Sequence, residues 1–150
     1  MTATRRQARE WAIQILTAAD LNPHDDVRSF VDDVWDEIAT ADSKNGEPPG
    51  GKPKAFAEER VFGVLESTAK IDAVLSSLLD NWDIARLGTV ERAVLRMGIW
   101  EMSVAGIPPP VVINEAIDLA NWFSSPKSRP LINGVLDKYA KTIAPGAAAK

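Results

Sequence analysis

Three arginines near the start of the chain have the residue type and spacing to bind phosphate. Arg5, Arg6 and Arg9 lie within the first eleven residues, where Glu10 is the only acid, so this stretch has a side-chain charge of +2. The whole chain has a net charge of −4. Guanidinium groups donate paired, charge-assisted hydrogen bonds to phosphate oxygens and stack on exposed bases. This basic stretch in an acidic protein is therefore the first candidate binding site.

The arginines lie in a segment whose apolar residues have helical spacing over about residues 4–20. Arg5 and Arg9 are four residues apart and so are neighbours on one face, while Arg6 lies about 100° round the helix from Arg5. We expect the apolar stripe to attach the helix to the core and the arginines to stand on its outer side. The stripe consists of Ala8, Trp11, Ala12, Ile15, Leu16 and Ala19.

Cations at a helix N-terminus oppose the macrodipole by a few tenths of a kcal/mol each. A local rule broken without local gain indicates a functional role, here the binding of phosphate or RNA. The structural alternative is that the arginines pair with acids elsewhere or solubilise the helix end. The residues alone leave both interpretations open.

Helical periodicity recurs along the rest of the chain, and no alternating strand pattern interrupts it. The sequence therefore predicts an all-α fold of about seven short helices packed as bundles. The segment 71–82 either continues the helix before it or follows a kink. The predicted helices cover about residues 4–20, 24–41, 56–69, 71–82, 89–105, 111–123 and 129–143.

A chain of 150 residues suits a single domain. Residues 42–54 are rich in Gly, Pro and charge and lack a large apolar residue, so we expect a flexible loop there, and a disordered tail at 144–150. The loop contains the outline of a phosphate-binding P-loop from Gly46 to Lys52. Pro53 stands where Ser or Thr is needed, and no strand precedes the glycine, so nucleotide binding is not expected.

The residue types exclude most catalytic and metal-binding chemistry. The chain has no cysteine, and His24 is its only histidine, which removes disulfides, thiolate nucleophiles and histidine-based metal sites. The carboxylates suit helix starts and solvated faces, and none is paired with a nucleophile at a recognisable spacing. We therefore expect no catalytic residue, no metal and no cofactor. No apolar run is long enough for a membrane span, and no signal peptide is evident, so a cytoplasmic protein is the default.

Four segments resemble the transcription antitermination factors of the NusB family. They read RRQAREWAIQIL, WDIARLGTVERAVLRMGIWEM, PPPVVINEAIDLANWF and LINGVLDK. They follow the family's order and spacing, and with the helices between them they cover nearly all of the chain except the loop and the tail. The combination of VxINEAIxLA with a following xINGVLDK is the most specific part of this resemblance.

The resemblance implies two small helical bundles packed together and no enzymatic activity. It implies binding of boxA, a short single-stranded RNA element in ribosomal RNA leaders, together with the ribosomal protein NusE. Through the antitermination complex, RNA polymerase then reads past terminators. The family's RNA contact surface is its arginine-rich first helix, which corresponds to Arg5, Arg6 and Arg9 here.

The resemblance also marks departures from the family and further candidate residues. Gln7 interrupts a longer arginine run, although its amide can still bond a base or a phosphate. Thr17 and Leu131 stand where many members carry aromatic residues. Lys127 and Arg129 lie in a segment that the family fold places near the RNA surface, and we expect them to extend the basic patch. The alternative for these two cations is a solvated loop.

For the protein partner, the resemblance points to Glu91, on the helix that begins near Thr89. The alternative to a partner-binding role is that Glu91 is a first-turn acid that offsets the helix macrodipole.

Two rival functions remain. One is a helical protein-interaction adaptor without specific RNA binding. The other is a NusB-like RNA-binding module related to the N-terminal domain of ribosomal RNA cytosine methyltransferases, although this chain has neither a G-x-G-x-x-G unit nor a catalytic cysteine.

Overall fold

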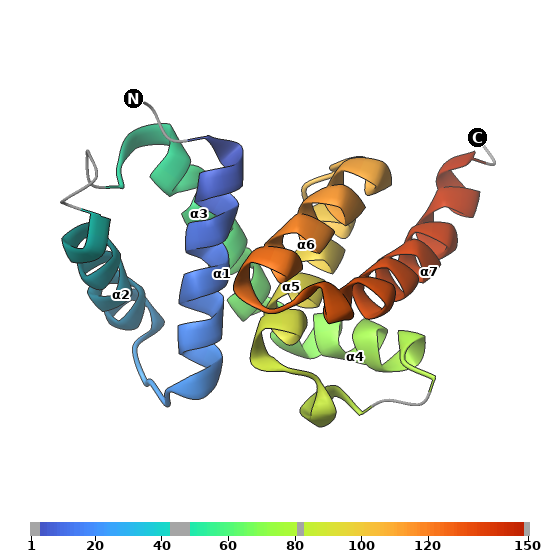
Figure 1. Ribbon diagram of the computed structural model, residues 1–150, viewed down its shortest axis with the longest axis horizontal. Coiled ribbons are helices and arrows are strands. Elements are labelled where there is room, and N and C mark those ends of the chain that lie inside the picture. Colours follow the sequence, from blue (N-terminus) through green and yellow to red (C-terminus); the bar gives the residue numbers. More distant parts are fainter. Residues whose placement is uncertain (1–3, 43–48, 81–82, 149–150) are drawn as a thin grey trace. The chain divides into compact units, whose positions relative to one another are not determined.

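The fold is all-α in the part of the chain that the structure describes. A computed structural model describes residues 4–42, 49–80 and 83–148, with backbone alone for residue 42 and for 144–148. These residues form seven α-helices and two short 3-10 helices (Figure 1). They divide into an N-terminal unit, Met1–Phe62, and a C-terminal unit, Gly63–Lys150. The predicted class and the predicted number of helices are confirmed.

The N-terminal unit contains α1 (Arg5–Leu21), α2 (Val27–Asp42) and most of α3 (Gly51–Glu66). α1 packs against α2, and their two tryptophans meet edge to face, with the ring centroids of Trp11 and Trp35 5.7 Å apart. The Trp35 indole Nε1 also donates a 2.9 Å hydrogen bond to Glu58 on α3. Buried Trp side chains need such a partner, so this bond ties α3 to the aromatic pair.

The C-terminal unit is built around three mutually packed helices, α5 (Thr89–Ser103), α6 (Pro109–Phe123) and α7 (Arg129–Ala148). The fourth helix, α4 (Thr68–Leu78), packs on α5 and α7. The short helices η1 (Ile84–Arg86) and η2 (Pro126–Ser128) precede α5 and α7.

Two features hold the C-terminal helices close together. A Cβ added at Gly98 would lie 3.0 Å from a methyl carbon of Leu136, so the glycine permits the close approach of α5 and α7. Arg96 on α5 donates two 2.8 Å hydrogen bonds to the carboxylate of Asp72 on α4. Bidentate pairs of this kind are the more stabilising ion pairs because their geometry is fixed.

Several helix boundaries differ from the predicted ones. α3 already begins at Gly51, whose φ of +58° favours glycine, so the end of the predicted 42–54 loop is helical. Pro53 is tolerated there because the first-turn amides of a helix have no intrahelical acceptor. Residues 43–48, which include Gly46 of the P-loop outline, lie outside the described residues.

The other differences concern α4 and α7. The stripe predicted at 71–82 does not continue α3, because Ser67 separates α3 from α4. α4 ends at Leu78, and residues 81–82 of the predicted stripe lie outside the described part of the chain. α7 runs to Ala148 and so extends into the tail for which disorder is expected, while residues 149–150 lie outside the described part.

Candidate nucleic-acid interface

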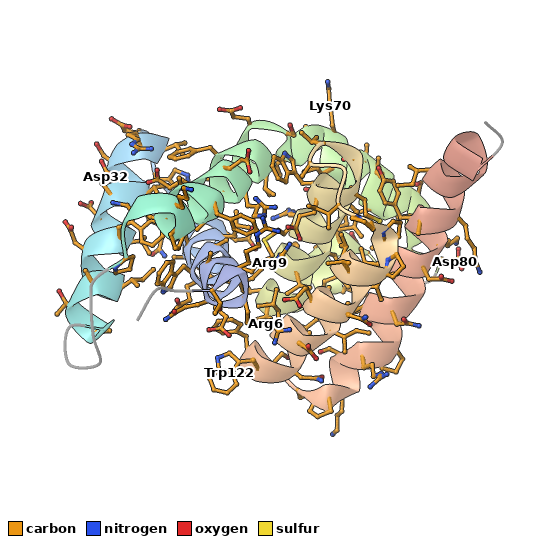
Figure 2. All side chains as sticks on the ribbon, turned by 90° about the horizontal axis from the view of Figure 1, so that it is seen from above. Arg6, Arg9, Asp32, Lys70, Asp80 and Trp122 are labelled. Carbon is orange, nitrogen blue, oxygen red and sulfur yellow. The ribbon has the colours of Figure 1, made fainter. Side chains whose placement is uncertain are left out.

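The first turn of α1 presents two cations and an amide on a capped helix end. Thr4 is the N-cap, and its hydroxyl accepts a 3.1 Å hydrogen bond from the backbone amide of Gln7. Arg5 and Gln7 are exposed, and Arg6 is half-buried. The cap fixes the backbone that carries all three side chains, so they project from ordered helix. Figure 2 shows the positions of Arg6 and Arg9 on α1.

The expectation that Arg9 stands on the outer side of the helix is wrong. Its exposed fraction is 4%, close to that of the core residues around it. α1 buries almost every residue from Ala8 to Leu16, so its covered face is much wider than the apolar stripe indicates. A phosphate cannot reach the Arg9 guanidinium in this arrangement.

Arg9 belongs to a cluster of three guanidinium groups around one aromatic ring. The guanidinium carbons of Arg5, Arg9 and Arg60 lie 5.7, 5.2 and 3.5 Å from the centroid of Phe56. All three distances are within the range of cation–π attraction. We call these four residues the Phe56 cluster. It connects the first turns of α1 to α3 within the N-terminal unit.

Arg60 is the buried member of the cluster that is most tightly held. It is 2% exposed, and its Nη1 donates to the Glu59 carboxylate at 2.9 Å and to the Phe56 carbonyl at 3.3 Å. Buried charge is tolerated where it is paired and hydrogen-bonded, which is the case here. Sequence reasoning missed Phe56 and Arg60. The available signal was their i, i+4 spacing on a predicted helix, which places a ring and a cation side by side.

A carboxylate on α1, that of Glu10, lies near the half-buried Arg6. Partial burial raises the pKa of Glu10, and the positive charge of Arg6, four residues earlier, offsets part of that rise. Arg6 therefore lies within electrostatic reach of an acid on its own helix. The local charge of the first two turns is still positive, because three arginines face this one acid.

The other two predicted cations belong to the C-terminal unit. Lys127 lies in η2 and Arg129 is the first residue of α7, and both are exposed. Neither forms an ion pair within the described residues. By contrast, Lys138 on α7 pairs with Asp80 at 2.9 Å, so part of the positive charge of this helix is neutralised.

Glu91 joins three elements of the C-terminal unit. One of its carboxylate oxygens accepts hydrogen bonds from the hydroxyls of Ser124, at 2.6 Å, and Ser128. The start of α5, the end of α6 and the end of η2 therefore meet at this carboxylate, which we call the Glu91 clamp together with the two serines. Ser128, the residue before α7, donates its hydroxyl to Glu91.

The clamp depends on a glycine and keeps its carboxylate ionised. A Cβ at Gly88 would clash with Glu91 Oε1, so a larger residue would displace the carboxylate. Partial burial raises the pKa of Glu91. Hydrogen bonds from the hydroxyls of Ser124 and Ser128 and from a backbone amide together lower this pKa by more, so the net shift is downward. A binding role for Glu91 toward a protein partner remains a prediction.

Thr17 and Leu131, which stand where many family members carry aromatic residues, do not form a stacking surface for bases. Thr17 is half-buried, and its hydroxyl donates a 2.9 Å hydrogen bond to the Gln14 carbonyl. Leu131 is a half-buried aliphatic residue near the start of α7. Neither side chain offers a ring to a base.

The described residues lack two further classes of site. No group of three or more Asp, Glu or His side chains there could hold a metal ion. No helix in that part of the chain has the length and apolar character required to cross a membrane.

The chain matches the NusB family model over residues 6–141. A transcription antitermination protein NusB from a Nitratiruptor species is 37% identical, and the match covers 96% of each chain. Its counterpart from Campylobacter jejuni subsp. jejuni is 38% identical over 93% of this chain and 97% of the relative. The resemblance found in the four sequence segments is thus confirmed over nearly the whole length.

Solved structures of the same family have a similar fold. A NusB from T. maritima has a TM-score of 0.79 at 29% identity and covers 94% of this chain and 93% of that one. The NusB chain of a complex of antitermination factors NusB and NusE with double-stranded RNA has a TM-score of 0.76 at 27% identity. That match covers 92% of this chain and 96% of the other.

Proposed function

The chain belongs to the NusB family, and on that premise we propose that it binds boxA RNA of ribosomal RNA leaders together with NusE. In this proposal it supports read-through by RNA polymerase as part of the antitermination complex. It acts in the cytoplasm by binding alone and carries out no reaction. The observation that carries the proposal is the capped first turn of α1, which holds Arg5 and Arg6 on ordered helix.

The chemistry of this turn suits a single-stranded RNA backbone. Arg5 and Arg6 donate to phosphate oxygens, and the amide of Gln7 bonds a base or a phosphate. Arg9 has a different role in this account because it is buried: it holds the helix on Phe56 and leaves RNA contact to its neighbours. Lys127 and Arg129 add two cations from the C-terminal unit.

The role of the protein partner rests on a relative. A NusB of similar fold was solved in a complex with NusE and double-stranded RNA, which supports the same two classes of partner for this chain. Phosphate contacts alone give little sequence preference, so base contacts and NusE must supply the discrimination. Glu91 contributes to NusE binding in this proposal, either directly or by holding the surface around the start of α5.

Filter binding over a salt series tests the proposed function. The probes are a boxA-like single strand, a scrambled strand of the same composition and a duplex, each with and without NusE. Phosphate contacts by two arginines predict a slope of log K against log salt of about −1.4. If Lys127 and Arg129 also contact phosphate, the predicted slope is about −2.8. We expect boxA to bind most tightly and NusE to increase the preference.

The alternative function is a protein adaptor without specific RNA binding. An adaptor would bind NusE and would show the same weak, salt-sensitive affinity for boxA and for the scrambled strand. That result would contradict the proposal while leaving the family assignment intact.

A further inference from the structure

Trp122 is an exposed tryptophan in a protein that buries its other described tryptophans. Its exposed fraction is 73%, against 5% for Trp11, 4% for Trp35 and 5% for Trp100. Its side chain forms no hydrogen bond and no ring contact within the described residues. Figure 2 shows the side chain extending away from α6. Leaving so large an apolar ring in water forgoes the burial that normally stabilises a fold.

The exposure of Trp122 follows from its place on α6. The helix buries Val112, Ala116, Leu119 and Ala120, and Trp122 lies two residues, or about 200°, beyond Ala120. The ring therefore lies on the solvent-facing side of α6, opposite the side that packs into the core.

The segment that follows Trp122 is basic and firmly held. Residues 121–131 contain Lys127 and Arg129 and no acid, although the whole chain is acidic. The hydroxyls of Ser124 and Ser128 lie 3.5 Å apart, and both bond the Glu91 carboxylate. The connection from α6 to α7 is thus a short 3-10 turn whose two ends are bonded to the Glu91 carboxylate. Trp122 is two residues before the clamped pair, and Arg129 is one residue after it.

We propose that Trp122 stacks on a base of single-stranded RNA whose phosphates contact Lys127 and Arg129. The inference rests on the proposed function and adds to it an aromatic platform in the C-terminal unit. Base stacking on an aromatic ring tolerates any sequence and commonly accompanies a track of cations. Both cations follow Trp122 in the sequence, so the strand runs from Trp122 toward Lys127 and Arg129.

The surroundings of Trp122 favour RNA over a protein partner. A protein interface has a contiguous apolar core, with aromatic residues packed among others. The only other large apolar residue exposed on the described face of α6 is Val111, eleven residues away, with Asn114 and Asp118 between. A single exposed ring, followed within seven residues by two exposed cations, is too small for such a core and is sufficient for one stacked base.

Binding of boxA-like and scrambled single strands by Trp122→Ala, over a salt series and without NusE, tests the inference. We expect a loss of affinity of about fivefold or more for both strands at every salt concentration. The slope against salt should not change, because the ring carries no charge. Trp122→Phe should recover most of the affinity. Lys127→Ala/Arg129→Ala should instead reduce the magnitude of the slope by about 1.4.

Val104→Ala is the matched control, since Val104 is an apolar residue of the same unit that is 65% exposed. It should bind RNA as the wild type does. If the wild type prefers boxA and Trp122→Ala binds with unchanged affinity, the inference is overturned and the proposed function stands. Loss of NusE binding with unchanged RNA affinity also overturns it, in favour of protein docking. If the wild type shows no preference for boxA, the proposed function is contradicted, and the inference fails with it.

Discussion

At Phe56 a single ring holds three guanidinium groups, and one of them, Arg5, belongs to the helix turn proposed to bind RNA. The ring is attractive to cations because its face carries partial negative charge. Arg60 and Arg9 are buried against it, while Arg5 remains exposed. The cluster therefore orients the exposed side chain of Arg5, which is proposed to bind phosphate, against two buried neighbours.

Replacing the ring should weaken RNA binding without unfolding the protein. Phe56→Leu keeps the apolar volume and removes the cation–π attraction, worth about 0.5–1 kcal/mol for an exposed arginine. The expected loss of affinity for boxA is therefore about two- to fivefold. Phe62→Leu is the control, because Phe62 is also half-buried on α3 and pairs with Arg28 at 4.9 Å. Equal affinity losses in both variants would contradict a special role for Phe56.

The Glu91 clamp predicts a pH-dependent contribution to stability. The pKa of Glu91 is lowered in the folded protein from its ordinary value of 4.5, so folding favours the ionised form. This contribution is complete above the ordinary pKa and is lost as the pH falls through the folded pKa. The free energy of unfolding of wild type minus that of Glu91→Gln should be constant near neutral pH and shrink below about pH 4.5. Chemical denaturation at several pH values measures this difference in the free energy of unfolding. A difference that does not change with pH would show that ionised Glu91 does not stabilise the fold.

Residue environments were the least predictable part of the site. The periodicity of α1 places Arg9 beside Arg5, which is correct, but burial depends on what covers the helix. A neighbouring ring from α3, far away in sequence, cannot be read from the spacing of residues 4–20. The two serines on Glu91 are equally remote, 33 and 37 positions along the chain. Local patterns predict the face that a residue occupies, and only the tertiary structure supplies its partners.

At the scale of the element, the N-cap of α1 connects helix stability to binding. Thr4→Ala removes the acceptor of the Gln7 amide, a change that typically costs about 0.5–2 kcal/mol. The first turn, with Arg5 and Arg6, should then fray, so we expect a lower melting temperature and weaker binding of boxA. Thr4→Ser retains a hydroxyl cap and should restore both. Thermal unfolding and filter binding check the pair, and full RNA affinity in Thr4→Ala would show that the cap is irrelevant to the site.

The helices themselves were largely predictable because their apolar residues recur with the same period. Their ends were less so. Pro53 and the glycines before it are typical of loops, yet they lie at the start of α3, where a proline needs no amide hydrogen. Ser67 gives no strong stop signal, and its break between α3 and α4 was one of two open alternatives.

At the scale of the whole molecule, the charge distribution separates non-specific from specific binding. A net charge of −4 disfavours adhesion to nucleic acid in general, while the exposed cations of α1 and of residues 127–129 attract phosphate locally. Affinity should therefore be modest, steeply salt-dependent and strengthened by NusE. The family and the all-α fold could be predicted from the sequence, because the NusB landmarks span both units.

The most direct test of the central claim is boxA binding by Arg5→Ala/Arg6→Ala in the presence of NusE. Arg9 is left in place because its removal would disturb the buried Phe56 cluster and obscure the result. We expect a loss of affinity together with a salt slope smaller in magnitude by about 1.4, with NusE binding unchanged. Thermal stability should fall by no more than the loss of the Arg5–Phe56 contact, about 0.5–1 kcal/mol. Wild-type affinity and an unchanged slope in the double variant would rule out RNA binding through Arg5 and Arg6.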